Sequence, residues 1–238
     1  MTIIRIGADP EGFLFDAKGD AVPAYGYVPG DKHNPHELDG GAVQVDGMAV
    51  EFNIDPVTNA DDFVKNIWKV TSQIDEMIKA VDSELSVRWI PIAKFRKTIW
   101  NVAPEQSKML GCDPDWNVSG QINANPTSKL EGNPIRTAAG HIHIGFRDDL
   151  IDDPLDPSHF NLCLMIAQGF FKGHLSSYIP NTLDEEERMQ YYGHNGSFRP
   201  KKYGVELRAP SNLWVQTEEA QRKIFHETRS KFHDLTGL

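Results

Sequence analysis

Four short segments of the sequence carry pairs of polar residues, spaced two positions apart, that are able to bind a metal ion or an anion. The pairs are Asp9 with Glu11, Glu51 with Asn53, His141 with His143, and Glu206 with Arg208. In an extended strand, residues i and i+2 point to the same face. Both histidines of HIHIG therefore face one side, while Ile142 and Ile144 face the other. We expect the polar sides to line one face of a sheet and the apolar sides to pack under helices.

Carboxylates dominate this set, and their convergence would demand cations. The four are Asp9, Glu11, Glu51 and Glu206. A partly buried carboxylate without a partner costs several kcal/mol, so a cavity that holds four of them needs positive charge. Two histidines suit Zn²⁺, whereas an oxygen-dominated set suits Mg²⁺ or Mn²⁺, and Mn²⁺ tolerates histidine. With four carboxylates and two histidines, this set of candidate ligands favours Mg²⁺ or Mn²⁺. For any single pair, an ordinary solvated sheet face is the alternative.

Hydrophobic periodicity predicts the elements that position these residues. Strands are expected over 3–15 with an interruption at Gly-Ala-Asp-Pro, over 85–93, 139–146 and 203–209, and as a hairpin over 42–54 that turns at Asp46-Gly47. Helices are expected over 59–82, 158–179 and 217–232. The predicted strands and helices do not alternate regularly as β-α-β units along the chain. This order predicts an α+β fold in which a curved antiparallel β-sheet has helices packed on one face, and it predicts a single domain over residues 1–238.

Two segments fall outside this periodicity. Residues 111–134 are rich in Asn, Gly and Pro, and a loop this long inside a compact domain is usually functional. We expect residues 111–127 to cover the site. The charge run 184–188 is expected to be a solvated face.

The overall charge excludes some classes of protein. Lys and Arg total 24 against 34 Asp and Glu, a formal net charge of −10, which argues against a nucleic-acid coat or a membrane-surface protein. No stretch approaches 18 consecutive apolar residues, and the first residues lack a signal-peptide core. The two cysteines, Cys112 and Cys163, fit a reduced, cytoplasmic protein. An acidic protein that handles an anion must neutralise it locally, with metal ions or a few arginines.

Three segments, in the same order along the chain, resemble those of known ligases. GADPEGFLFD is similar to the glutamine synthetase segment in which two acidic residues flank a proline. AAGHIHIGF is similar to the H-x-H strand of glutamine synthetases and glutamate–cysteine ligase-type enzymes, and YGVELRAP resembles their I-E-x-R-x-P strand. Together with LGCDPDWN, the combination most resembles the type-2 COOH·NH2 ligase (amidoligase) family. Many members of that family are encoded by phages, which would place this protein in a host cytoplasm.

The resemblance implies a glutamine synthetase-like catalytic domain that joins a carboxylate to an amine at the expense of ATP. An acyl phosphate is the implied intermediate, and two Mg²⁺ or Mn²⁺ ions are the implied metals. The implied metal ligands are Asp9, Glu11, Glu51, His141 and Glu206. The implied contacts to the nucleotide phosphates are His143, Arg199 and Arg208, and the implied catalytic residues are Arg208, Arg199 and Glu51.

Two positions extend or depart from the family pattern. Gly204 stands where glutamine synthetases carry an arginine, and Lys201 or Lys202 can substitute for that arginine in binding the nucleotide. Arg136, five residues before His141, is a further candidate contact to substrate or phosphate. No P-loop is present, so metals and arginines on the sheet would have to hold ATP.

The substrates expected from this interpretation are a small-molecule or peptide carboxylate and an amine, and the oligomeric state is open. A metal-dependent hydrolase is an alternative, because H-x-H with carboxylates can also hold two metals that activate water. A non-catalytic binding or structural protein and a guanidino kinase are further alternatives. Arg208 beside Glu206 favours the ligase over a hydrolase of neutral substrates.

Overall fold

The computed structural model describes residues 3–108, 115–123, 132–173, 178–193 and 196–238. Within these ranges, a nine-stranded sheet has the order β10-β11-β9-β1-β5-β4-β3, and β2 and β6 also pair with β1. Its strands are β1 (Arg5–Phe15), β2 (Ala21–Val22), β3 (His36–Leu38), β4 (Gly41–Asp46), β5 (Ala49–Ile54), β6 (Ser86–Arg88), β9 (Gly140–Gly145), β10 (Phe198–Lys201) and β11 (Gly204–Leu207). The strand pairs within this sheet are antiparallel. A smaller sheet pairs β7 (Ile92–Lys94) with β8 (Ile135–Thr137).

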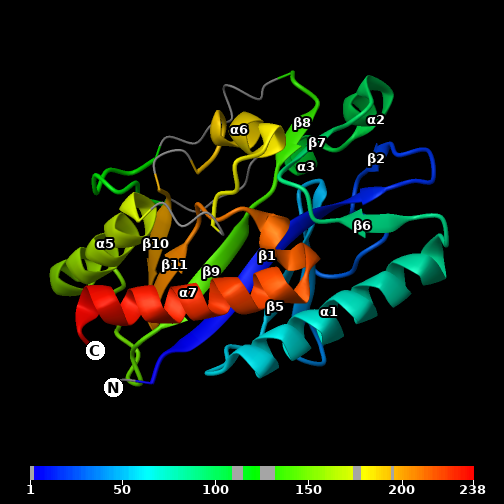
Figure 1. Cartoon of the computed structure of the whole chain (residues 1–238). Helices are drawn as coiled ribbons and strands as arrows, with labels where there is room; N and C mark the ends of the chain where they lie inside the picture. Colours follow the sequence, from blue (N-terminus) through cyan, green and yellow to red (C-terminus); the bar gives the residue numbers. More distant parts are fainter. Residues whose placement is uncertain (1–2, 109–114, 124–131, 174–177, 194–195) are drawn as a thin grey trace.

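Three long helices lie across one face of the large sheet (Figure 1). They are α1 (Ala60–Val81), α5 (Pro157–Lys172) and α7 (Glu218–Thr236). The side chain of Asn59 caps α1 by accepting a hydrogen bond from the Asp62 backbone N–H, and Asp156 caps α5 in the same way. Shorter helices are α2 (Lys97–Val102), α3 (Glu105–Lys108), α6 (Leu183–Met189) and the 3-10 helix η1 (Asn212–Gln216). The fold is therefore α+β with an antiparallel sheet, as predicted.

Alternation along the strands gives the sheet an apolar face and a polar face. Ile142 and Val205 belong to the main core, which also contains the buried stripes of the three long helices. On the opposite face the central positions are polar. Beyond them, Phe13 and Phe15 of β1 join Trp100 in a second apolar cluster. The polar region is thus bounded on one side by a second core.

The predicted hairpin and the three predicted long helices all form. The hairpin of β4 and β5 turns at Gly47, which has a φ of 58°, and Met48, one position later than predicted, because Asp46 still pairs with Ala49. The three helices correspond to α1, α5 and α7, but α5 ends at Lys172, before the predicted end at residue 179. The predicted interruption of the first strand is wrong, because β1 is continuous through Gly-Ala-Asp-Pro. Pro10 ends the ladder to β9, and Glu11 begins the ladder to β5. A proline is tolerated at such a ladder end because its missing N–H breaks no internal pair.

The structure differs from two other predictions, the strand over 85–93 and the solvated charge run over 184–188. The strand expected over 85–93 is divided into β6, which pairs with β1, and β7, which pairs with β8. The run 184–188 is not a uniformly solvated face, because Glu185 is 1% exposed and Arg188 is 0% exposed. The run forms α6, and residues three apart on a helix share one side. That side of α6 faces inward, while Asp184 and Glu186 remain exposed.

Two further expectations concern membranes and cysteines. Among the helices in the described ranges, none combines the length and the apolar character needed to cross a membrane. Cys163 of α5 is a free, buried thiol, and burial raises its pKa to about 12. Cys112 lies outside the described residues.

Candidate functional site

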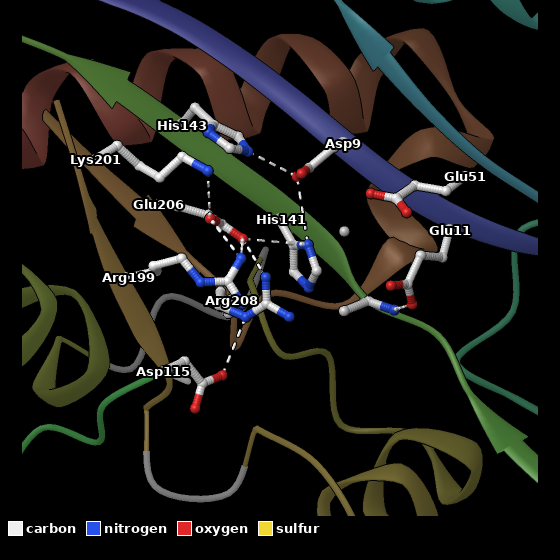
Figure 2. A network of polar contacts seen from close by, with 12 residues as sticks. Asp9, Glu11, Glu51, Asp115, His141, His143, Arg199, Lys201, Glu206 and Arg208 are labelled. Atoms are coloured by element: carbon white, nitrogen blue, oxygen red, sulfur yellow. Dashed lines mark hydrogen bonds and ion pairs between the residues drawn. The ribbon is translucent and has the colours of Figure 1, made fainter. Parts of the chain in front are cut away.

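Strand register brings the predicted site residues together on the polar face of the sheet. The cross-strand pairs are Asp9 with His141, His143 with Glu206, Glu206 with Arg199, and Glu11 with Glu51. Directly opposed residues in antiparallel strands have Cβ atoms about 5 Å apart. Residues from β1, β5, β9, β10 and β11 therefore meet in one region (Figure 2). Figure 2 shows Glu11 and Glu51 to one side of Asp9. The basic side chains of Arg199, Lys201 and Arg208 lie to the other side.

Asp9 and the two histidines form the centre of the first group of ligand atoms. Asp9 Oδ1 lies 2.8 Å from His143 Nε2 and 3.4 Å from His141 Nδ1, and His141 Nδ1 lies 3.8 Å from Glu206 Oε1. These approaches lack hydrogen-bond geometry: among the described residues, Asp9 Oδ1, His143 Nε2 and both His141 nitrogens have no hydrogen-bond partner. One ligand atom each from Asp9, His143 and Glu206 lie within 4.8 Å of one another. The donor set and the unsatisfied buried atoms fit a divalent cation.

The protonation states in this group follow from the neighbouring charges. Burial alone would raise the pKa of Asp9, but the two histidines outweigh it and hold the pKa well below its usual range. Burial would lower the pKa of His143, but Asp9 and Glu206 raise it above the ordinary value. The pKa of His141 is lowered by burial and by the Arg208 charge. The Tyr203 hydroxyl is hydrogen-bonded to His143 Nδ1, which leaves Nε2 directed toward Asp9.

Three basic side chains surround Glu206, and we call them the Glu206 basic group. They are Arg199, whose Nη1 lies 3.2 Å from Oε2, Lys201, whose Nζ lies 3.4 Å from Oε2, and Arg208, whose Nη1 pairs with Oε1. The Glu206 side chain is 1% exposed. Burial would raise its pKa, but Arg208 and the other nearby cations outweigh that effect and hold the pKa well below its usual range. Three cations therefore surround this one buried carboxylate and compensate its charge.

Arg208 is held from the other side by a residue that the sequence analysis did not single out. Its Nε donates a hydrogen bond to Asp115 Oδ2 at 3.1 Å, and Asn123 donates to Asp115 Oδ1 at 2.8 Å. Residues 115–123 are the described part of the loop that was expected to cover the site. The backbone of Trp116 pairs with that of Phe198, so this part of the loop lies beside β10. Residues 111–114 and 124–127 fall outside the described ranges.

Glu11, Asp46 and Glu51 form the second group, with one oxygen from each within 4.8 Å of the others. Burial raises the pKa of Glu11 to about 8, with a further contribution from the Asp46 charge. Burial and the neighbouring carboxylates also raise the pKa of Glu51 well above its usual range. The Ala139 backbone N–H donates to Glu11 Oε2 at 2.9 Å, and Gln44 donates to Glu51 Oε2 at 2.8 Å. Three carboxyl groups at such short range repel one another when they are ionised, and a bound cation would relieve that repulsion.

Sequence reasoning placed Asp46 only in the hairpin turn and missed it as a site residue. The available signal was its two-residue spacing from Gln44 on the same strand, which places both side chains on the face that carries Glu51. Of the two lysines considered as substitutes for the arginine missing at position 204, Lys201 contacts Glu206, whereas Lys202 is exposed in the turn after β10. Asn53 is exposed on β5. Arg136 is buried in β8, with its Cζ 4.3 Å from the centre of the Trp100 ring.

Comparisons with known proteins find similarity in the fold but not in the sequence. No protein-family model and no curated protein matches the chain. Its fold is similar to part of the crystal structure of a bifunctional glutathione synthetase from Pasteurella multocida, with a TM-score of 0.50 and 11% sequence identity. The similarity covers 96% of this chain and 38% of that chain, so the chain spans less than half the length of that protein. At this identity, the comparison shows a shared fold.

Proposed function

We propose that this protein is an ATP-dependent ligase that joins a carboxylate to an amine through an acyl phosphate. The observation that carries the proposal is the convergence of the Glu206 basic group on one buried carboxylate, beside Asp9 and the two histidines. If Glu206 also binds a metal cation, its negative charge no longer neutralises the three basic side chains fully. Those side chains are then able to bind the negatively charged phosphate oxygens of ATP. Arginine suits this role because its planar guanidinium binds two oxygens at once.

The order of the sequence motifs supports membership of the type-2 COOH·NH2 ligase family, with residues 1–238 as a glutamine synthetase-like catalytic domain. The structural neighbour adds support of a coarser kind. It is a synthetase of glutathione, a compound whose units are joined by amide bonds. A ligase that forms an amide bond agrees with both observations.

Two divalent cations, Mg²⁺ or Mn²⁺, fit the two groups of ligand atoms. The first would be held by Asp9, Glu206 and a histidine, either His143 or the neighbouring His141, and the second by Glu11, Asp46 and Glu51. The sequence resemblance assigned the metal to His141 and the phosphate to His143, whereas the ligand atoms group His143 with Asp9. When bound, such ions neutralise the charge of a polyphosphate and of the carboxylates that hold them.

The proposed chemistry has two steps. A carboxylate oxygen of the acid bonds to the γ-phosphorus of ATP, the bond from that phosphorus to the bridging oxygen breaks, and ADP leaves. The amine nitrogen then bonds to the acyl carbon, the bond from that carbon to the phosphate oxygen breaks, and the amine proton ends on the released phosphate. The first step is phosphoryl transfer, which depends mainly on positioning and charge neutralisation. Arg199 and Arg208 would supply both to the transferred group.

A metal-dependent hydrolase is the second candidate, because histidines beside carboxylates can also hold ions that activate water. The direct test measures ADP and phosphate release with Mg²⁺ over a panel of amino acids, peptides and polyamines. A ligase requires ATP, an acid and an amine together for release and for amide formation. Turnover of a substrate without ATP would contradict the ligase and support the hydrolase.

Variants connect the activity to the site. Glu206→Ala and His141→Ala should abolish turnover while circular dichroism shows an intact fold. Arg208→Lys should also be severely impaired, because a point charge does not replace a planar fork. Glu186→Ala, which changes an exposed carboxylate of α6, is the control and should keep full activity. Full activity in the Glu206 or His141 variant would place the active site elsewhere.

A further inference from the structure

Arg136 is a buried arginine whose guanidinium is only partly satisfied. The residue is 4% exposed, and its Nη1 donates to the Ile135 carbonyl at 2.8 Å. Among the described residues, its Nε and Nη2 have no hydrogen-bond partner. Burial without partners is costly for a charged group, and burial lowers the pKa of Arg136 to about 10. A side chain kept in this state is expected to serve a ligand.

The unsatisfied atoms form one edge of the guanidinium. Nε and Nη2 are adjacent parallel donors, and this edge can bind the two oxygens of a carboxylate. The same pair of atoms in Arg188 contacts Glu185 Oε1, at 2.8 Å from Nε and 2.5 Å from Nη2. One buried arginine of the chain thus uses this edge for a carboxylate, while the equivalent edge of Arg136 has no such partner among the described residues.

Arg136 is associated with the second group of ligand atoms, that of Glu11, Asp46 and Glu51, which we call the Glu11 end of the site. Ala139, three residues later in the chain, donates its backbone N–H to Glu11 Oε2. The Asp46 charge partly offsets the effect of burial on the pKa of Arg136, so these two charges lie within electrostatic range. The Glu206 basic group instead contacts Glu206. The site therefore has two separate sources of positive charge, and only the one at Glu206 is a cluster suited to a triphosphate.

The orientation of Arg136 is fixed by its packing. The guanidinium carbon lies 4.3 Å from the centre of the Trp100 ring, an arrangement that favours stacking of the planar group. Trp100 belongs to the second apolar cluster, and the backbone of Arg136 is paired with Ala93 of β7. A guanidinium held in place in this way loses little freedom on binding an anion.

We propose that the Nε–Nη2 edge of Arg136 binds a second carboxylate of the acid substrate, one that is not activated by ATP. This inference rests on the proposed ligase function and narrows its substrate class to acids with two carboxylates, free or within a peptide. The reacting carboxylate must reach the γ-phosphate near the Glu206 basic group, while the second carboxylate is held at the Glu11 end. Arg136 is thus a specificity-determining residue.

The first test measures binding and does not require turnover. Malonate, succinate, glutarate and adipate are titrated, with Mg²⁺ present, into wild type, Arg136→Met and Arg88→Met, and the unfolding temperature is followed. Arg88 is the matched control, because its Cζ lies 4.3 Å from the Phe15 ring centre but the residue is exposed. At least one diacid should raise the unfolding temperature of wild type and Arg88→Met, and not that of Arg136→Met. No shift in wild type, or an equal shift in Arg136→Met, would overturn the proposal.

Ligand-free stability distinguishes a binding role from a structural one. Arg136→Met should unfold at the same temperature as wild type or higher, because the substitution removes an unsatisfied buried charge. A clear fall in the unfolding temperature would mean that Arg136 serves the fold, and would overturn the inference.

Steady-state kinetics distinguish a role of Arg136 in binding the acid substrate from a role in binding the nucleotide. With hydroxylamine as the amine, Arg136→Met should lower kcat/KM for the preferred diacid by about 10- to 100-fold, as expected for lost hydrogen bonds to a charged group. The KM for ATP should stay unchanged. A matching rise in the KM for ATP would assign the edge to a nucleotide phosphate instead. If wild type fails to bind MgATP, the proposed ligase function itself fails, whatever the diacid titration shows.

Discussion

Arg208 Nε donates a hydrogen bond to Asp115 Oδ2 at 3.1 Å, which connects two residues 93 positions apart. Both side chains are buried, with exposed fractions of 5% and 7%. Arg208 also pairs with Glu206 through Nη1. The guanidinium is therefore held on two sides by carboxylates from different parts of the chain, which fixes its plane at the candidate phosphate position.

Removing the charge of Asp115 should weaken the function of Arg208 without unfolding the protein. In Asp115→Asn the hydrogen bond loses its ionic character, and hydrogen bonds to charged groups contribute about 1.5–3 kcal/mol, so kcat/KM for MgATP should fall about tenfold or more. Steady-state kinetics with varied ATP measure the change. Asp75→Asn, which alters an exposed ion pair with Lys79, should leave the kinetics as in wild type. Equal kinetics for the two variants would show that Asp115 does not orient Arg208.

Metal-free protein should lose stability as the pH rises through neutrality. The pKa of Glu11 is raised from 4.5 to about 8 by burial and by Asp46. When the pKa of a carboxyl group is higher in the folded protein than in the unfolded chain, protonation of that group favours the folded state at pH values below the pKa of the unfolded chain. This stabilisation is lost as the pH rises from about 4.5 to about 8, by up to about 1.4 kcal/mol per pH unit. In EDTA, urea unfolding between pH 5 and pH 8 should show this decline.

Glu11→Gln and Mg²⁺ provide the controls for that pH dependence. Glu11→Gln removes the titrating group, so its decline over the same pH range should be shallower than in wild type. Mg²⁺ should stabilise wild type more at pH 8 than at pH 5, because cations and protons compete for the same oxygens. Parallel pH curves for wild type and Glu11→Gln in EDTA would contradict a buried, protonated Glu11.

The buried pair of Glu185 and Arg188 should be important for stability. Arg188 contacts Glu185 Oε1 through two nitrogens and donates to the Ala209 carbonyl at 2.7 Å. Glu185→Ala leaves an uncompensated buried charge, which typically costs about 3–5 kcal/mol. The free energy of unfolding in urea measures this loss.

Two further variants test the origin of that loss. The double variant Glu185→Leu with Arg188→Met should recover most of the stability, because apolar residues of similar volume replace the pair. Glu186→Ala, on the exposed side of the same helix, should change stability by less than about 0.5 kcal/mol. A Glu185→Ala variant as stable as Glu186→Ala would show that the pair contributes nothing.

Gly140 permits a close approach between β9 and η1 next to His141. A Cβ atom at this position would lie 2.4 Å from Trp214 Nε1 and 2.5 Å from the Ser211 carbonyl oxygen. Gly140→Ala should therefore cost about 1–3 kcal/mol, as overpacking typically does, and should weaken Mn²⁺ binding by moving His141. Gly145→Ala, at the other end of the strand, meets its nearest atom at 3.6 Å and should be well tolerated. Calorimetric unfolding and Mn²⁺ titration of both variants test this difference.

The sequence alone determined which face of each strand is polar. In HIHIG and VELR, strict alternation leaves no other arrangement for an extended strand, and the structure buries Ile142 and Val205 in the main core. The sequence also determined that a hairpin turns around Gly47 and that a helix begins after Asn59, since both depend on interactions within a few residues, although the turn lies at Gly47 and Met48 and leaves Asp46 in the strand.

Only the tertiary structure decided which polar residues meet. Register between distant strands placed Asp46 beside Glu11 and Glu51, and packing of the loop brought Asp115 to Arg208. Periodicity within a segment defines a face but not its partner across the fold. For the same reason, the charge run of α6 did not reveal that Glu185 would be buried. Which side of a short polar helix faces inward depends on the surface against which it packs, and that surface comes from other parts of the chain.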